Sequence, residues 1–206
     1  MSNPFDLTGC RALVTGANTG IGQAIAVGLA QAGADVICAG RRTCDETLGR
    51  ITDAGGSASS VLVDFADPMA GAALFEGANI DILVNNAGGQ FPSLARHISD
   101  NGWKAVINTN VNGTFFMTRI MANRFFIPQK EGTIVNIIVN HYRGFPGMAH
   151  TGAARAAVEN LTKTLAQEWA TYNIRLNCVA PGTIISSGLD TYAEPVKALL
   201  DQMKED

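Results

Sequence analysis

The stretch that decides the fold reads TGANTGIG and occupies residues 15–22. It follows an apolar run at residues 12–14 and opens a segment whose apolar side chains recur at helical spacing, so it predicts a strand, a tight turn and an amphipathic helix. Gly16, Gly20 and Gly22 let the backbone adopt positive φ and approach a pyrophosphate, and N–H groups at the helix start would bind that anion. The pattern predicts the first turn of a nucleotide-binding βαβ unit, with an ordinary strand-to-helix connection as the alternative.

The rest of the chain alternates between strand and helix patterns, with no repeat and no low-complexity linker. This alternation predicts an α/β fold, a doubly wound, Rossmann-like parallel sheet in a three-layer αβα arrangement. With 206 residues, of which 47% are hydrophobic, the chain can bury one substantial core, so we expect a single domain over residues 1–206. Further strands are expected at residues 35–39, 60–63, 80–84, 133–139 and 174–179, and further helices at residues 68–77, 100–127 and 153–170.

The charge balance argues against several classes of partner. The chain has 15 basic and 18 acidic residues without a long run of either sign, which does not favour binding to nucleic acid or to an anionic membrane. We therefore expect small molecules and copies of the chain itself as partners. No apolar run reaches the length of a membrane span and the N-terminus has no signal-peptide pattern, so we expect a soluble cytoplasmic protein.

The cysteines do not indicate a metal site. The chain has four, which are scattered without the Cys-x-x-Cys spacing of a zinc site or a redox motif. Cys38 and Cys178 lie inside apolar runs that have the pattern of strands. We expect buried free thiols and no bound metal.

Two arginines predict which dinucleotide is bound. The strand expected at residues 35–39 leads into Gly40, Arg41 and Arg42, at the position where dinucleotide folds contact the adenosine ribose. An acidic residue there would bind the 2′-hydroxyl of NAD, whereas arginine favours the 2′-phosphate of NADP. We therefore expect NADP(H) to be preferred, with NAD(H) possible. Two solvated loop arginines are the alternative, and the nearby Asp45 opposes a purely basic site.

Further motifs carry a resemblance to a known family. The tetrapeptide NNAG at residues 85–88, Asn110 and the pair Pro181-Gly182 follow the glycine turn at spacings that resemble the short-chain dehydrogenase/reductase family, from about Leu7 to Ser187. The resemblance implies an adenine contact at Asp64 and Phe65 and a nicotinamide contact at Ser186. The other cofactor-binding residues that it implies are Asn18, Thr19, Ile21, Asn86, Ala87, Gly88, Arg155, Pro181, Gly182 and Ile184.

The same resemblance also implies that copies of the chain associate. It implies a homodimer or homotetramer formed through the long helices that carry Asn110 and Arg155, with Phe115, Phe116, Phe125 and Phe126 supplying apolar surface. The chain stops at Asp206, before the last strand-bearing unit typical of the family, so we expect the sheet to lack that unit.

The catalytic pattern of the family is broken in this chain. Members usually carry a serine, a tyrosine and a lysine, with the tyrosine phenol as proton donor. Here Thr151 and Arg155 stand at the tyrosine and lysine positions, Ile138 lies near the serine position, and Asn110 is unchanged. Arginine can hold ribose hydroxyls and keeps its positive charge, but it cannot share a proton as lysine can. Threonine cannot replace a phenol.

The missing phenol raises the question of the proton donor. Tyr142 lies on the loop that leaves the fifth expected strand at its carboxyl end, the edge where doubly wound sheets bind ligands, so we expect it to donate the proton. His141 is the alternative, because an imidazole titrates near neutral pH. A third possibility is that Tyr142 only packs over the loop. The predicted catalytic set is Asn110, Tyr142, Thr151 and Arg155.

The reaction itself admits three hypotheses. The back half, including residues 86–91 and 150–155, resembles the enoyl-CoA and dienoyl-CoA reductase branch and especially peroxisomal trans-2-enoyl-CoA reductase, whereas residues up to about Asn85 resemble the 2-deoxy-D-gluconate 3-dehydrogenase branch. This change is compatible with a natural mosaic or an engineered chimera. We expect hydride transfer to a polarised C=C or C=O, foremost in an acyl-CoA thioester. A sugar-acid or alcohol dehydrogenase, acting on a ketone or alcohol, and a cofactor-binding relative without turnover are the alternatives.

Overall fold

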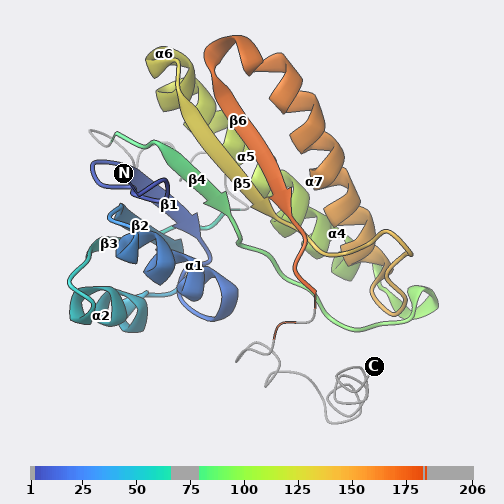
Figure 1. Ribbon diagram of the computed structural model, residues 1–206. Helices are drawn as coiled ribbons and strands as arrows, with labels where there is room; N and C mark the ends of the chain where they lie inside the picture. Colours follow the sequence, from blue (N-terminus) through green and yellow to red (C-terminus); the bar gives the residue numbers. More distant parts are fainter. Residues whose placement is uncertain (1–2, 66–78, 183, 185–206) are drawn as a thin grey trace.

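The computed structural model describes residues 3–65, 79–182 and 184 (Figure 1). In this part of the chain, six strands form one sheet in the order β3-β2-β1-β4-β5-β6, and every neighbouring pair is parallel. The predicted doubly wound fold is thereby confirmed. The strands are β1 (Arg11–Thr15), β2 (Asp35–Gly40), β3 (Ser57–Leu62), β4 (Ile82–Asn85), β5 (Gly132–Ile137) and β6 (Ile174–Val179).

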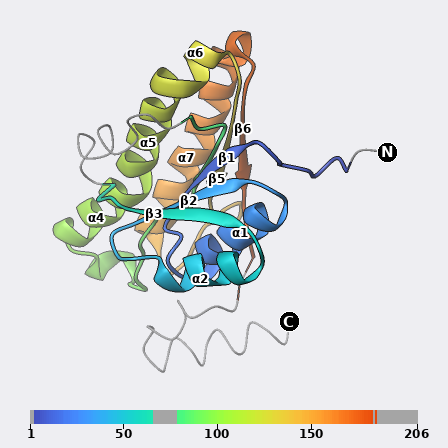
Figure 2. The same cartoon turned by 90° about the vertical axis from the view of Figure 1, so that its left-hand side faces the viewer.

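Helices cover both faces of this sheet, which gives the three layers seen in Figures 1 and 2. One face is covered by α1 (Gly20–Gln31) and α2 (Asp45–Asp53), and the other by α4 (Asp100–Ile107), α5 (Gly113–Met121) and α7 (Ala149–Glu168). The shorter pieces are two π-helical turns, Asn108–Asn112 and Ala122–Phe126, the single turn α6 (Ile127–Gln129), and two 3₁₀ turns, Ala95–His97 and Ala170–Tyr172.

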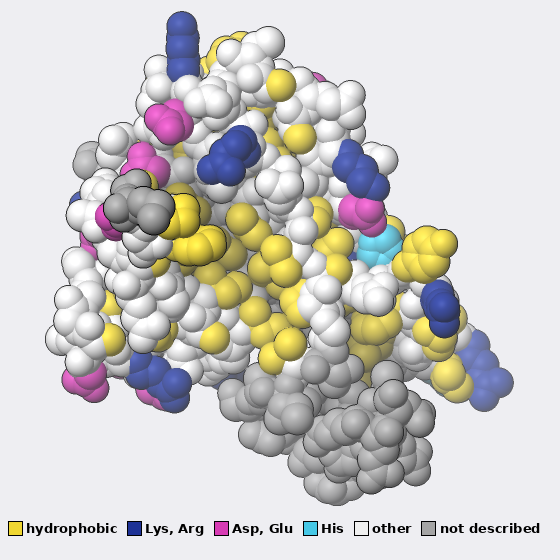
Figure 3. Space-filling model, viewed as in Figure 1, with side chains coloured by type: hydrophobic (Ala, Val, Ile, Leu, Met, Phe, Trp, Pro, Cys, Tyr) yellow, Lys and Arg dark blue, Asp and Glu magenta, His cyan; other side chains and the backbone are white. Residues whose placement is uncertain are grey.

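The alternating side chains of the strands divide the core in two, because successive residues of a strand point to opposite faces. Leu13 of β1 packs with Met121 and Leu165 beneath α5 and α7, while its neighbours Ala12 and Val14 pack with α1 and α2. Figure 3 shows apolar side chains gathered over the middle of the sheet on the face that carries α1 and α2. No described helix is long and apolar enough to cross a bilayer.

The first helix begins and ends as its sequence indicates. Thr19 caps α1 in an extended conformation without a side-chain hydrogen bond, and the first turn of the helix has no acidic residue. At the other end, Gly33 takes a φ of 102°, which favours glycine, and an added Cβ would lie 2.7 Å from Thr8 Oγ1. The first turn of α1 therefore keeps the N–H groups that an anion needs.

Several predicted boundaries were wrong. β3 begins three residues earlier than expected, at Ser57, because its polar first half completes the ladder with β2. The helix expected at 153–170 begins at Ala149. The helix expected at 100–127 is interrupted by two π-helical turns and continues past Pro128 to Gln129, where Lys130 ends it in the left-handed region. The helix expected at 68–77 lies outside the described residues.

The sheet order places a ligand-binding edge between β1 and β4. The chain runs outward from β1 through β2 to β3, and then returns to β4 on the other side of β1. This reversal is a topological switch point, and the carboxyl ends of the two strands there are where doubly wound sheets bind ligands. The glycine turn follows β1 and the NNAG tetrapeptide includes the end of β4, so both predicted motifs lie at this point.

Candidate active site

The glycine turn is shaped by close backbone contacts. Gly16 and Gly20 take φ values of 66° and 58°, in the region that favours glycine. A Cβ on Gly16 would lie 3.0 Å from Ala87 Cα, and a Cβ on Gly22 would collide with Gly16 O and the Asn86 amide. From the sequence, we expected Gly22 to let the backbone approach a pyrophosphate with positive φ, and Gly22 does not take a positive φ. The structure instead shows that this glycine lets the two turns pack together.

Hydrogen bonds join the same two turns. Asn86 Nδ2 donates to the carbonyl oxygens of Thr15 and Gly16 at 3.1 and 3.2 Å. Thr15 Oγ1 accepts from the backbone N–H groups of Asn86 and Ala87, both at 2.9 Å, and donates to Val84 O at 3.2 Å. The resemblance placed Asn86 in the cofactor site, and its side chain here supports the walls of that site.

An open cleft of about 630 Å³ lies over the switch point. Arg41 and Arg42 are exposed at its β2 end, and Gly88 lies at its β4 end. The structure thus brings together eight of the predicted cofactor residues, which are Gly16, Asn18, Arg41, Arg42, Asp64, Phe65, Ala87 and Gly88. It adds four that the sequence analysis missed, Gly40, Ala105, Asn108 and Thr109.

The remaining predicted cofactor residues lie around this cleft or beyond the described chain. Thr19 and Ile21 are at the start of α1, next to Gly20. Pro181, Gly182 and Ile184 follow the carboxyl end of β6. Ser186 lies outside the described residues. The cleft suits a dinucleotide because of the volume of the cleft, the glycine turn after β1 and the two arginines at the β2 end.

Asn110 is buried where α4 passes into α5. It lies on the first π-helical turn, and such turns are frequent at functional sites. Its Nδ2 donates to Gly89 O and Val106 O, both at 2.8 Å, while its Oδ1 has no hydrogen-bond partner. The side chain is therefore fixed in orientation with one acceptor left free.

Thr151 and Arg155 lie one helical turn apart on the first turns of α7, which packs against the π-helical turn that carries Asn110. Thr151 is fully buried and its Oγ1 has no partner, whereas Arg155 keeps 9% of its surface and its Nη1 donates to Ile137 O at 2.8 Å. Burial lowers the pKa of the Arg155 guanidinium to about 10, so the group stays charged at neutral pH. A Cβ on Gly88 would collide with Arg155 Nη2 and lie 2.7 Å from Asn110 Oδ1, so both groups lie beside this glycine.

His150 is a buried neighbour of Thr151 for which we predicted no role from the sequence. Its ring is fully buried, Nδ1 accepts from the Thr151 backbone N–H at 3.0 Å, and Nε2 has no partner. The Phe91 ring packs on it edge to face, with 4.4 Å between the centroids. The signal was hidden because the helix was expected to begin at residue 153, which left His150 in a loop.

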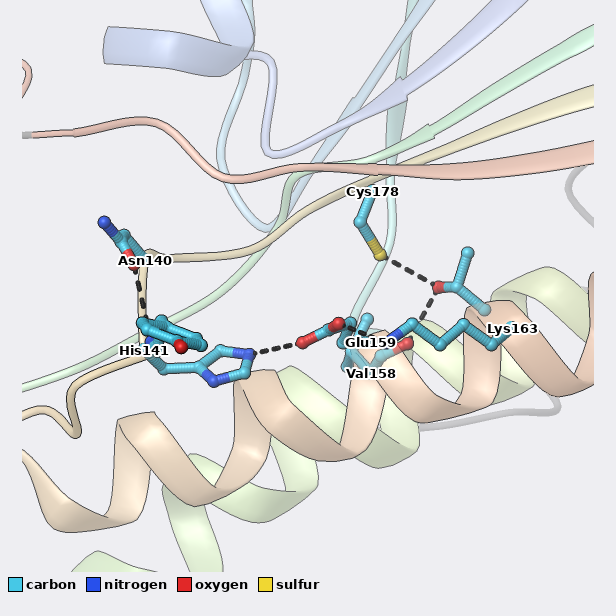
Figure 4. A network of polar contacts seen from close by, with 8 residues as sticks. Asn140, His141, Val158, Glu159, Lys163 and Cys178 are labelled. Carbon is cyan, nitrogen blue, oxygen red and sulfur yellow. Dashed lines mark hydrogen bonds and ion pairs between the residues drawn. The ribbon is translucent and has the colours of Figure 1, made fainter.

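The two predicted proton donors lie elsewhere on the loop that follows β5. Tyr142 is 91% exposed. His141 Nε2 lies 2.8 Å from Glu159 Oε2, and Lys163 binds the other oxygen of the same carboxylate (Figure 4). No hydrogen bond joins Tyr142 or His141 to Asn110, Thr151 or Arg155 in the described part of the chain. Three of the four predicted catalytic residues are therefore brought together, and Tyr142 is not.

The described residues contain no group of three or more histidine, cysteine, aspartate or glutamate side chains that could hold a metal ion. All four cysteines are free. Cys38 and Cys44 are buried, and burial raises the pKa of the Cys38 thiol to about 12. These thiols are therefore protonated at neutral pH.

The parallel sheet, the glycine turn at the switch point and the cleft above it define a dinucleotide-binding α/β protein. The family model for short chain dehydrogenases matches residues 11–196. The chain therefore belongs to the short-chain dehydrogenase family and is an oxidoreductase of that family, as the sequence motifs predicted.

The relatives include members of both branches that the sequence resembled. A 2-dehydro-3-deoxy-D-gluconate 5-dehydrogenase of Dickeya dadantii is 36% identical over 98% of this chain and 81% of its own length. A Bacillus subtilis protein classed as a 2,4-dienoyl-CoA reductase is 35% identical over 85% of this chain and 73% of its own. A solved structure from Agrobacterium tumefaciens, classed as a 2-deoxy-D-gluconate 3-dehydrogenase with bound NADP, matches with a TM-score of 0.89 and 44% identity over 97% of this chain and 83% of its own.

Proposed function

We propose that the chain is an NADPH-dependent oxidoreductase that interconverts a hydroxyl and a ketone in a sugar acid. The observation that carries this proposal is the 44% identity, over nearly the whole chain, to a structure classed as a sugar-acid dehydrogenase with bound NADP. The sequence analysis placed thioester reduction first and sugar-acid chemistry second. The relatives favour the reverse order, because 2-dehydro-3-deoxy-D-gluconate dehydrogenases from several organisms match this chain over most of its length.

The cleft has the groups that would hold NADPH. The glycine turn and the N-terminus of α1 would bind the pyrophosphate, and Arg41 or Arg42 would bind the 2′-phosphate by a charge-assisted hydrogen bond. Asp64 and Phe65 would contact the adenine, and Ala87 and Gly88 would let the backbone lie against the nicotinamide half. When bound, the cofactor supplies the hydride and the reacting carbon accepts it.

The chain's own contribution to the reaction is electrostatic. The buried Arg155 guanidinium would hold ribose hydroxyls beside Gly88, and its charge would stabilise oxygen that becomes negative during reduction. The Asn110 amide is anchored by two backbone carbonyls, and its free oxygen lies beside the Arg155 head group at Gly88, where it can accept a hydrogen bond. Preorganised dipoles and charges act strongly in such a buried site, because little solvent screens them.

Reduction of an enoyl thioester is the second candidate. It is favoured by the dienoyl-CoA reductase relative and by the resemblance of residues 150–155 to that branch, where Thr151 stands in place of the usual tyrosine. Loss of turnover with retained cofactor binding is the third. A small-molecule substrate is common to the first two, and a cytoplasmic location remains a prediction for all three.

A substrate panel separates these candidates. Purified protein is assayed for NADPH oxidation with keto sugar acids, with 2-enoyl and 2,4-dienoyl thioesters of coenzyme A, and with simple ketones, alongside a fluorescence titration of NADPH. Our proposal predicts turnover with keto sugar acids at a kcat/KM at least about ten-fold above that for the thioesters. A preference for thioesters supports the second candidate. Tight NADPH binding without oxidation by any substrate supports the third.

A further inference from the structure

Acidic side chains are absent from the two segments that contain β4, β5 and the loops that follow them. No aspartate or glutamate occurs at residues 82–99 or 132–158, although the chain as a whole has 18 acidic and 15 basic residues. The same segments contain all three histidines of the chain and three of its arginines, Arg96, Arg143 and Arg155. Positive charge is therefore concentrated in one part of a weakly acidic protein.

The two loops lie against each other at the edge of the sheet that bears the cleft (Figure 1). β4 and β5 are parallel neighbours, so the loops that follow them leave the sheet at the same edge. The Ser93 N–H donates to Gly147 O at 2.7 Å, and the Phe91 ring packs on the His150 ring. We call these two loops, residues 89–99 and 138–150, the basic rim.

The two exposed arginines of the basic rim have no acidic partner. Arg96 and Arg143 form no ion pair with a described residue. Arg96 Nε donates to His97 Nε2 at 3.0 Å, which leaves the charge of the guanidinium uncompensated. The N-terminus of α7 adds to this charge, because the helix has 20 residues and no acidic side chain in its first turn.

The carboxylates that border the basic rim have basic neighbours. Glu159 of α7 is bound by Lys163 and by His141, as Figure 4 shows. Asp100 begins α4, and Lys104 follows it one helical turn later. These carboxylates therefore do not cancel the charge of Arg96 and Arg143.

We propose that the basic rim selects substrates by their negative charge, and that Arg96 and Arg143 attract the carboxylate of a keto sugar acid to the site. The inference rests on the proposed function, which it deepens by naming the residues that distinguish an acid from a neutral sugar. The phosphate of the cofactor has arginines of its own, Arg41 and Arg42, at the β2 end of the cleft. The basic rim acts through its electric field, which extends about 8 Å at physiological ionic strength and needs no fixed contact.

Replacement of both arginines by glutamine removes the charge and keeps a polar side chain. At saturating NADPH, Arg96→Gln/Arg143→Gln should raise the KM for the best keto sugar acid about five-fold or more and leave kcat within about two-fold. The KM for the uncharged amide of the same acid should not change. Arg96→Lys/Arg143→Lys keeps both charges and should behave as wild type. An equal rise in KM for the acid and the amide, or a lysine variant as weak as the glutamine variant, would overturn the proposal.

Arg175→Gln is the matched control, because it removes the same charge at the opposite edge of the sheet. Arg175 is exposed near the start of β6, four residues before Val179. At about 3.3 Å per residue it lies about 13 Å from the carboxyl edge, which is more than the Debye length of about 8 Å. The KM for the acid should therefore stay at the wild-type value. A rise as large as that of the glutamine double variant would contradict a specific role of the basic rim.

Salt provides a second readout that a purely structural role would not change. Because ions screen exposed charges, the KM of wild type for the acid should rise several-fold between about 0.02 M and about 0.3 M salt, with NADPH saturating throughout. The KM for the amide should stay level, and the glutamine double variant should show a smaller rise for the acid. A KM for the acid that does not depend on salt would refute the proposal.

A binding measurement separates this proposal from the proposed function. Calorimetric titration of the protein loaded with NADP⁺, with gluconate and with uncharged gluconamide, needs no turnover. Binding of gluconate about five-fold or more tighter than that of gluconamide, lost in Arg96→Gln/Arg143→Gln, supports the proposal even if no keto acid is reduced. Equal binding of the two ligands refutes it even if keto acids are reduced.

Thioesters of coenzyme A test whether the charge belongs to a phosphate instead. A 2-enoyl-CoA is compared with the phosphate-free pantetheine thioester of the same acid, in wild type and in Arg96→Gln/Arg143→Gln. We expect the loss of charge to affect gluconate more than the coenzyme A thioester. An effect confined to the coenzyme A thioester would assign the basic rim to the phosphates of that substrate and would overturn the carboxylate.

Discussion

Gly22 shows how one residue of the fold-deciding stretch acts. Its missing side chain lets the turn after β1 approach Asn86, so a methyl group there would push the two walls of the cleft apart. We expect Gly22→Ala to weaken NADPH binding at least about ten-fold and to destabilise the protein by about 1–3 kcal/mol, as overpacking does. Nicotinamide fluorescence and urea unfolding measure the two effects.

Gly28 provides the control for this prediction. It lies on the same helix, α1, but nothing is within 4 Å of the Cβ that alanine would add. Gly28→Ala should leave NADPH affinity unchanged and stabilise the protein by about 0.4–1 kcal/mol. If Gly22→Ala and Gly28→Ala behave alike, the packing of the glycine turn has been misassigned.

Arg41 and Arg42 are the residues that we expect to decide the choice of cofactor. Both are exposed at the cleft, and hydrogen bonds to charged groups contribute about 1.5–3 kcal/mol. The double variant Arg41→Ala/Arg42→Ala should therefore lose about ten-fold or more in NADPH affinity, with little change for NADH. Arg50→Ala, which removes an exposed arginine paired with Glu46 on α2, is the control. A double variant with unchanged affinity for both cofactors would refute the role of these arginines.

The elements are held together by polar side chains buried between the sheet and the helices. Asn85 of β4 donates to Thr118 of α5 at 2.9 Å and to Asn136 of β5 at 2.8 Å, and Asn136 donates to Thr162 of α7 at 2.8 Å. Asn136→Ala would leave partners unsatisfied on both sides, so we expect a loss of about 3 kcal/mol in urea unfolding. Asn177→Ala, on an exposed position of β6, should change stability by less than about 0.5 kcal/mol. Similar losses in the two variants would contradict the importance of this chain of hydrogen bonds.

Elements also show how far the sequence could predict the structure. β6 forms over the expected residues because its alternation of apolar and polar residues and its ladder with β5 have the same ends. β3 also includes residues 57–59, whose sequence SAS has few apolar side chains. These residues join the strand because pairing with β2 satisfies the hydrogen-bonding groups of their backbone. The early start of α7 was missed, and with it the burial of His150 and Thr151. Patterns of residue types along the sequence do not show such tertiary contacts. The exposure of Tyr142 depends on tertiary contacts as well.

At the scale of the whole molecule, self-association remains a prediction. Two of the phenylalanines expected at an interface, Phe125 and Phe126, are buried in the core and cannot contribute, which corrects the sequence analysis. Phe115 and Phe116 on α5 are only half-buried and pack with Arg119. We expect a dimer at micromolar concentration in sedimentation, weakened about ten-fold or more by Phe116→Asp and unaffected by Phe5→Asp. A monomeric wild type would contradict this.

Direct transfer of hydride is the central claim about the molecule, and isotope labelling tests it. The protein is mixed with excess keto sugar acid and with NADPH that carries deuterium at both transferable positions of the nicotinamide, and the product is analysed by mass spectrometry. Our account predicts a hydroxy acid with one deuterium on the former carbonyl carbon, formed by wild type and, at a cofactor concentration below its Kd, formed more slowly by Gly22→Ala. Saturated NADPH binding with no deuterium in any hydroxy acid would contradict it.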